Sequence, residues 1–64
     1  MPRRAYHYRD LERLSPRQRQ VMLLAKEGLT DREIAAILGI SKATVESTLK
    51  MVFDKLNVHD RRKL

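Results

Sequence analysis

The stretch from residue 30 to residue 50 constrains the fold most, because two helical patterns flank a short break. Thr30 and Glu33 have the spacing of a capping box, in which a side-chain oxygen satisfies the free N–H groups of a helix start. Gly39 supplies the backbone freedom that a sharp turn between helices needs. Ser41 is a suitable N-cap for the next helix. A short helix, a tight turn and a longer helix together predict a helix-turn-helix.

A second capping pattern predicts a helix before this unit. Ser15 can cap it, Pro16 suits its first position, and Gln18 completes the box. Gly28 ends this helix, and Leu29 is expected to tuck beneath it. The expected inward stripe consists of Val21, Leu24 and Ala25, with Met22 and Leu23 beside it.

The remaining patterns complete an all-α reading of the chain. The second helix is expected over about 31–38 and the third over about 42–56, where Asn57 is placed for a left-handed C-cap. Asp60 could cap a fourth helix, but the chain ends after one turn. We therefore expect a small four-helix domain over residues 14–64 with a short or truncated fourth helix. Residues 1–13 are expected to form a flexible basic arm that becomes helical near Arg9 to Leu14.

Composition narrows the function of a chain of this size. Its 64 residues are 42% hydrophobic, which suits a small helical core but leaves no room for a cleft with a buried active site. The net charge of +6 and the pI near 10.3 are typical of nucleic-acid binders, although many small basic proteins bind no nucleic acid.

Several classes of protein are not expected. The chain has no cysteine and only two distant histidines, so neither a disulfide nor a metal site is expected. No apolar run approaches the roughly 18 residues of a membrane span, which makes the cytoplasm the expected compartment. No catalytic constellation or Gly-rich phosphate loop is present, so an enzyme is not expected, and no cofactor is implied.

Four blocks of the sequence carry a resemblance to a known family. They are Leu14 to Val21, Gly28 to Ala35, Leu38 to Glu46 and Lys55 to Arg61. Together they resemble the LuxR/GerE-type helix-turn-helix domain, and the resemblance extends from residue 14 to residue 64 in unbroken register. It is specific because separated blocks agree in both residue type and spacing.

The resemblance implies a transcription regulator that binds double-stranded DNA. It implies that the third helix enters the major groove and that the fourth helix, in the C-terminal segment, mediates a homodimer. Such domains are usually the output end of a longer protein, so the chain is expected to be a stand-alone member or a fragment of a longer regulator. The short fourth helix leaves the strength of a dimer open.

Three positions depart from the pattern that the resemblance implies. The family commonly has an acidic residue where Gln18 stands, so an ion pair from that position is expected to be missing. It commonly has a histidine where Thr48 stands and often a basic residue where Glu46 stands. Because the last two lie on the expected recognition helix, the DNA sequence read is expected to differ from that of typical members.

The third helix has an outward face suited to reading bases. Glu46, Ser47 and Lys50 lie away from its apolar positions and correspond to the family's base-reading positions. Lys50 can donate to guanine, Glu46 can accept from cytosine N4, and Ser47 can do either. Glu46 and Lys50 also have the spacing of a simple surface ion pair on a solvated helix. The apolar positions of this helix are Val45, Leu49, Val52 and Leu56.

Phosphate contacts are expected at helix starts and from basic residues beside the groove. The candidates are Thr30, Lys42, Thr44, Thr48, Lys55 and Arg61. Helix capping is an alternative role for Thr30 and can coexist with a phosphate contact. For Thr44 the alternative is a second capping interaction with Ser41.

Two other readings remain open. The promoter-reading region of a sigma factor has a similar helix-turn-helix, but the block from Lys55 to Val58 followed by Arg61 favours the LuxR type. A helix-turn-helix can also serve as a protein-interaction module, for instance toward an RNA polymerase subunit. Salt dependence separates this module from a DNA binder, because neutralising several phosphates makes affinity fall steeply as salt rises.

Overall fold

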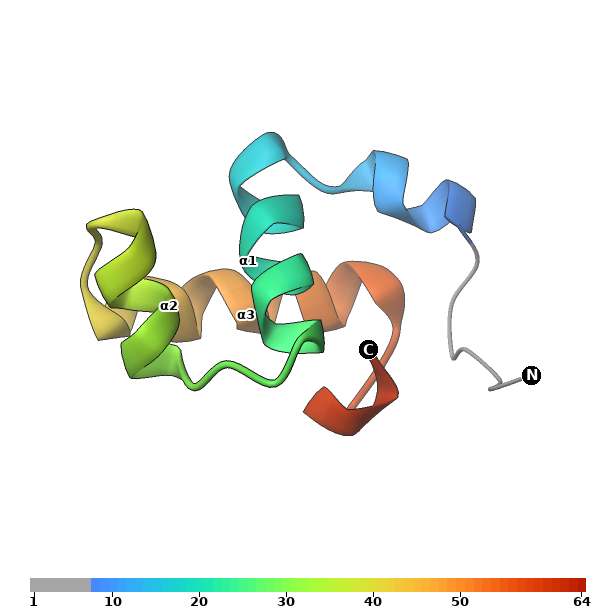
Figure 1. Ribbon diagram of the computed structural model, residues 1–64. Helices are drawn as coiled ribbons and strands as arrows, with labels where there is room; N and C mark the ends of the chain where they lie inside the picture. Colours follow the sequence, from blue (N-terminus) through green and yellow to red (C-terminus); the bar gives the residue numbers. More distant parts are fainter. Residues whose placement is uncertain (1–7) are drawn as a thin grey trace.

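The computed structural model describes residues 8–64 and contains three α-helices and two short 3₁₀ helices (Figure 1). The α-helices are α1 (Pro16–Lys26), α2 (Asp31–Leu38) and α3 (Lys42–Leu56), and the 3₁₀ helices are η1 (Tyr8–Arg13) and η2 (Arg61–Lys63). Residues 8–64 contain no strand. The expected all-α fold and the positions of the three expected helices are confirmed.

Each α-helix begins at a cap made by its own neighbouring residues. In the α1 box, the Ser15 amide donates to Gln18 Oε1 over 3.0 Å and the Gln18 amide donates to Ser15 Oγ over 3.2 Å. In the α2 box, the Thr30 amide donates to Glu33 Oε1 over 2.8 Å and the Glu33 amide donates to Thr30 Oγ1 over 3.2 Å. Ser41 caps α3. These bonds satisfy amides that have no partner inside a helix.

Two left-handed residues end the helices of the helix-turn-helix unit. Gly39 follows α2 with a φ of 67°, and Asn57 follows α3 with a φ of 56°. Glycine adopts this conformation at no steric cost, and asparagine tolerates it better than most residues. The predicted turn and the predicted C-cap are both confirmed.

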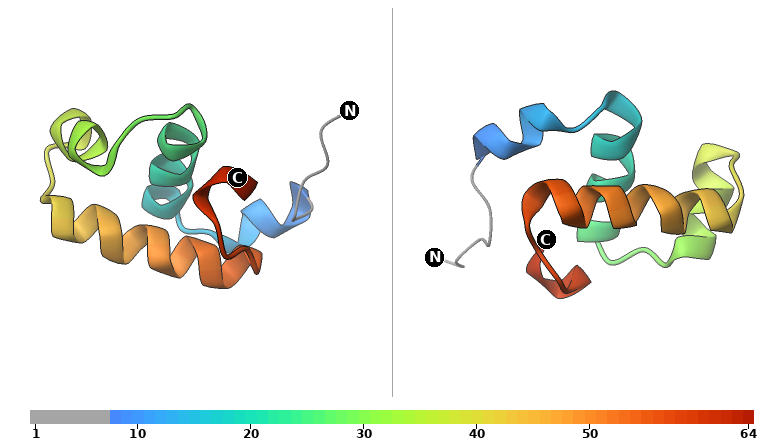
Figure 2. Two further views of the ribbon diagram at one scale, coloured as in Figure 1. Left: turned by 90° about the horizontal axis from the view of Figure 1, so that it is seen from below. Right: turned by 180° about the vertical axis from the view of Figure 1, so that it is seen from behind.

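The long helix α3 forms one side of the molecule, and α1 and α2 pack on it from the other (Figure 2). Two buried clusters fill the space between them, and Phe53 and Leu64 pack against both. The cluster toward η1 contains Leu14, Met22, Val52, Leu56 and Val58. The cluster toward α2 contains Val21, Ala25, Ile34, Ala35, Val45 and Leu49.

The buried face of α1 is broader than the expected stripe. Met22, expected beside the stripe, is fully buried, whereas Leu24 is only half-buried. The reason is that α1 serves both clusters: Met22 packs toward the end of α3, and Val21 and Ala25 pack toward α2. A helix that serves two clusters needs a wider apolar face than a single narrow stripe.

The two ends of the chain differ from simple continuous helices. The short fourth helix is the single 3₁₀ turn η2, where the Asp60 side chain accepts from the Arg62 amide over 2.8 Å. It lies in the C-terminal segment (residues 57–64), which folds back beside α1 (Figures 1 and 2). Residues 1–7 of the expected arm lie outside the described residues, and residues 8–13 form η1, near the predicted helical turn.

Candidate nucleic-acid interface

The outward face of α3 presents the three expected base-reading residues together. Glu46, Ser47 and Lys50 are exposed, whereas Val45 and Leu49 are buried against α1 and α2. The burial of one face fixes the rotation of the helix, so the opposite face must point to solvent. The side chains of Glu46, Ser47 and Lys50 can therefore contact a ligand that lies along α3.

Glu46 pairs with the residue one turn before it. Its Oε1 lies 3.8 Å from Lys42 Nζ, and both side chains are more than half exposed. The expected partner was Lys50, one turn after Glu46, but no ion pair joins those two side chains. Exposed pairs of this kind contribute little, typically below about 1 kcal/mol, so Lys42 can leave Glu46 for another anion.

The starts of α2 and α3 lie at one surface hollow. Thr30, Lys42 and Arg61 line it together, with Gly28, Leu29, Asp31 and Arg32 forming the rest of the lining. The Thr30 side chain caps α2, so its alternative role is confirmed. The Thr44 hydroxyl lies 2.8 Å from Ser41 Oγ, so the alternative for Thr44 is confirmed as well. Both threonines remain exposed.

Thr48 does not face the expected ligand. The residue is only 7% exposed, and its hydroxyl donates to the Thr44 carbonyl over 2.7 Å. Threonine in a helix often makes this bond to the carbonyl four residues earlier. The hydroxyl proton is therefore used inside α3, and Thr48 drops out of the phosphate candidates.

The Lys55 side chain connects the end of α3 to η1 and to α1. Its Nζ donates to the Arg13 carbonyl over 3.1 Å and to Gln18 Oε1 over 3.0 Å. Gln18 therefore meets the charged Lys55 through a hydrogen bond to its neutral side chain. Lys55 is held at the end of α3, where it stabilises packing on α1.

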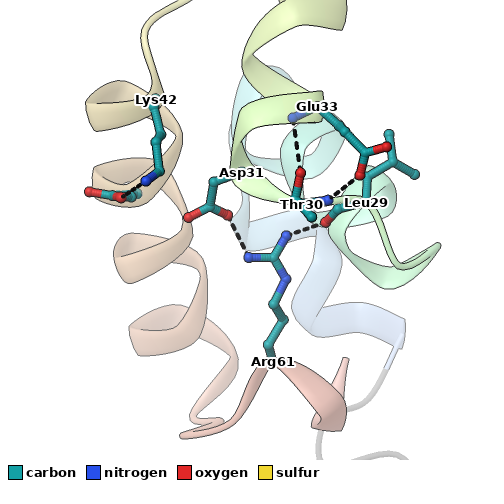
Figure 3. A network of polar contacts seen from close by, with 7 residues as sticks. Leu29, Thr30, Asp31, Glu33, Lys42 and Arg61 are labelled. Carbon is teal, nitrogen blue, oxygen red and sulfur yellow. Dashed lines mark hydrogen bonds and ion pairs between the residues drawn. The ribbon is translucent and has the colours of Figure 1, made fainter.

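Arg61 is also engaged within the protein. Its guanidinium donates to Asp31 Oδ1 over 2.5 Å and to the Leu29 carbonyl, as Figure 3 shows. The Arg61 side chain is 34% exposed and the Asp31 side chain 21% exposed. The C-terminal segment is thereby fastened to the first turn of α2, and a simple phosphate role for Arg61 is unsupported.

Two carboxylates near these helix starts are held in their charged form. Amide donation from Thr30 lowers the pKa of Glu33, and the Thr30 hydroxyl adds to the effect. Hydrogen bonds from the Arg62 side chain and then from its amide lower the pKa of Asp60 to about 2. Both groups are therefore anionic at neutral pH.

Sequence spacing could not reveal the partner of Arg61. Asp31 and Leu29 are about thirty residues away in the chain, and neither was among the candidate residues. The acidic start of α2 was visible, but it also fits ordinary helix-dipole stabilisation. Only the packed structure brings the acidic start of α2 to the C-terminal segment.

The described residues also limit other kinds of site. None of the helices in residues 8–64 is both long and apolar enough to cross a membrane. Over the same residues, no group of three or more His, Cys, Asp or Glu side chains is placed to hold a metal ion.

The chain has a net charge of +6 and a helix-turn-helix whose second helix, α3, exposes polar residues on its outer face. These features define a DNA-binding domain of the transcription-regulator class. Comparison with family models gives the same answer for residues 12–64, which match the model described as bacterial regulatory proteins, luxR family. The chain belongs to this family.

Curated relatives are transcription regulators of greater length. The chain is 43% identical over 51 residues to the probable transcriptional regulatory protein SgaR of Hyphomicrobium methylovorum, covering 80% of this chain and 24% of SgaR. It is 40% identical over 52 residues to the two-component response regulator PprB of Pseudomonas aeruginosa, covering 81% and 19%.

A third relative extends the match along more of the chain. The nitrate/nitrite response regulator protein NarL of Escherichia coli is 34% identical over 58 residues, covering 91% of this chain and 27% of NarL. The chain therefore spans about a fifth to a quarter of the length of these relatives. No solved structure matches the chain significantly.

Proposed function

We propose that this chain binds double-stranded DNA in a sequence-specific manner by inserting α3 into the major groove. The observation that carries the proposal is the single exposed face of α3 with Glu46, Ser47 and Lys50 on it. A helix fits the major groove, where each base pair presents its own pattern of donors and acceptors. Lys50 then donates to guanine, and Glu46 accepts from cytosine or repels an unsuitable sequence.

The proposed phosphate contacts come from the hollow at the starts of α2 and α3. Thr30 and Lys42 line this hollow, and Thr44 is exposed in the first turn of α3, next to helix-start amides that favour anions. Lys42 leaves its weak pair with Glu46 to meet a phosphate, which frees the Glu46 carboxylate toward the bases. Phosphate contacts of this kind fix register and orientation on the duplex.

The proposed working form is a homodimer through the C-terminal segment, on two half-sites about 34–36 Å apart. RNA polymerase is the further partner proposed for a regulator bound in this way. Membership of the luxR family favours this function over the promoter-reading region of a sigma factor. A protein-interaction module is the competing function, and it requires no steep dependence on salt.

Selection from a random-sequence duplex pool at two salt concentrations tests the proposal. The expected result is an inverted repeat, retained more weakly at the higher salt concentration. Salt-sensitive retention without a motif would contradict sequence-specific reading. The absence of retention at low salt would favour the protein-interaction module.

Two lysine variants separate base reading from phosphate contact on the selected site. We expect Lys50→Ala to cost about 1–3 kcal/mol and to relax the preference at one base step. Lys42→Ala is expected to weaken all sequences alike and to reduce the salt slope by about 1. Fluorescence anisotropy on the selected duplex and on single-step variants measures both effects.

Arg17→Ala is the control, because it removes one positive charge from an exposed position of α1, outside the proposed DNA contacts and the proposed dimer segment. It is expected to change neither the base preference nor the affinity appreciably. Equal losses on every sequence for both Lys50→Ala and Lys42→Ala would contradict the assigned roles.

A further inference from the structure

The Asp31–Arg61 pair lies between the two parts of the proposed interface. Together with Thr30 and Lys42, these two residues line the hollow at the helix starts. Asp31 and Arg61 also line a second hollow, whose other residues are Glu46, Leu49, Lys50 and Phe53. An Asp31 carboxylate therefore stands beside both the proposed phosphate contacts and the proposed base-reading residues.

A free carboxylate at this place opposes DNA binding. The N-terminus of α2 stabilises an acidic residue through the helix dipole, which explains why Asp31 suits the isolated domain. A phosphate that approaches Thr30, however, meets the same carboxylate as a like charge. The charge of Asp31 must therefore be compensated for this surface to accept DNA.

Arg61 supplies that compensation through two separate nitrogen atoms. One donates to the Asp31 carboxylate and the other to the Leu29 carbonyl, as drawn in Figure 3. The planar guanidinium suits two acceptors at once, and the two bonds hold its charge against Asp31. Two-thirds of the Arg61 side chain is covered, since 34% of it is exposed.

We propose that Arg61 is a positioning residue for DNA binding that acts through Asp31, neutralising the carboxylate between the two hollows, and does not contact phosphate itself. The proposal depends on the DNA binding put forward above. It corrects the expected phosphate role of Arg61 and assigns the C-terminal segment a part in preparing the DNA-facing surface of the same chain.

A double-mutant cycle on the whole chain tests this role, with a labelled random-sequence duplex at about 0.1 M salt as the probe. Affinity varies with about the 0.9 power of salt per phosphate, so one unit of charge corresponds to roughly eightfold at this concentration. Arg61→Gln leaves Asp31 uncompensated and is expected to weaken binding by about that factor. Adding Asp31→Asn to it is expected to restore affinity to within about twofold of the original chain.

Arg62→Gln is the matched control. Arg62 forms a similar ion pair with Asp60, over 2.8 Å, in the same 3₁₀ turn, but it lines neither of the two hollows. This variant removes the same charge and is expected to weaken binding by less than about threefold, because the Arg62 side chain is 89% exposed and salt screens an exposed charge outside the two hollows.

The outcomes separate the possible roles of Arg61. If the double variant binds as weakly as Arg61→Gln while both variants keep the thermal midpoint of the original chain, Arg61 contacts DNA directly and the proposal is overturned. If Arg61 only stabilises the fold through its bond to Asp31, both variants will have a lower thermal midpoint, and adding Asp31→Asn will restore no affinity. If the unaltered chain fails to bind the duplex at any salt, the proposed function fails first.

Arg61→Gln retains an amide donor, which limits the loss of folding stability, and circular dichroism melting checks that each variant is folded. Arg61→Lys gives a second test, because it keeps the charge beside Asp31 but loses the paired donors. It is expected to keep affinity within about threefold of the original chain. A loss as large as that of Arg61→Gln would contradict neutralisation as the role.

Discussion

Asp60 shows how one partly exposed carboxylate can make folding depend on pH. It caps η2 by accepting the Arg62 amide, and it also accepts from the Arg62 guanidinium. These bonds favour the ionised carboxylate and lower its pKa from the ordinary value of 3.8 to about 2. Since the bonds exist only in the folded chain, ionisation of Asp60 favours folding.

The sign of this linkage gives a prediction for acid conditions. A lowered pKa in the folded state means that the stabilisation is present above about pH 4 and is lost as the pH falls toward 2. The thermal midpoint is therefore expected to fall across this window, and Asp60→Asn is expected to make the fall shallower. Melting curves followed by circular dichroism between pH 5 and pH 2 measure the change.

Arg62→Gln serves as the companion variant, because it removes the main donor to Asp60 and should flatten the same part of the curve. Glu33 also has a lowered pKa, so some dependence on pH is expected to remain. An Asp60→Asn profile parallel to that of the original chain would contradict the assignment.

At the scale of elements, two left-handed residues decide where α2 and α3 stop. Gly39 and Asn57 have similar positive φ angles, 67° and 56°. A Cβ built on Gly39 meets no atom within 4 Å, so space does not exclude a side chain there. The cost of a side chain at Gly39 is therefore conformational and arises within its own backbone.

This comparison predicts opposite effects for exchanges at the two positions. Gly39→Ala is expected to lower the free energy of unfolding by about 1 kcal/mol or more, because alanine is strained at positive φ. Asn57→Gly is expected to raise it by a few tenths of a kcal/mol. Urea denaturation of both variants measures the two signs, and a gain in stability from Gly39→Ala would refute the conformational account.

The sequence predicted the elements well because their boundaries depend on neighbouring residues. The boxes of Ser15 with Gln18 and of Thr30 with Glu33 join residues three apart, so spacing alone reveals them. The outward face of α3 followed in the same way from helical periodicity. The helix-turn-helix and the exposure of the proposed base-reading residues could therefore be predicted from local features.

The remaining parts of the candidate site depend on contacts across the fold. Lys55 reaches Gln18 across 37 positions, and Arg61 reaches Asp31 across 30. Spacing along one chain carries no information about such partners, so these cations were assigned to phosphate. The inward turn of Thr48 could be suspected, because threonine in a helix often bonds to an earlier carbonyl.

Across the whole molecule, one aromatic side chain and the last residue join two small cores. Phe53 and Leu64 pack against both buried clusters, although neither is fully covered. A domain of this size has roughly 3–10 kcal/mol of stability in total. The contact between the clusters therefore decides whether the three helices unfold together.

Phe53→Ala is expected to lower the free energy of unfolding by about 2–3 kcal/mol, below the usual 3–5 kcal/mol because Phe53 is only half-buried. Phe53→Leu is the control, since it keeps apolar contact with both clusters and should cost less than about 1.5 kcal/mol. Urea denaturation followed by circular dichroism compares the two. Equal losses for both variants would contradict this account, because apolar contact with the two clusters would then not explain the contribution of Phe53.

The locally made caps have a consequence for the speed of folding. Ser15, Thr30 and Ser41 each bond within three residues, so every helix start can form before the helices meet. Helical chains with such short-range contacts generally fold within microseconds to milliseconds. We expect the docking of α3 and the Asp31–Arg61 bond to form later, because contacts between residues distant in sequence require closure of a loop, and the surface proposed to meet DNA would then be completed last.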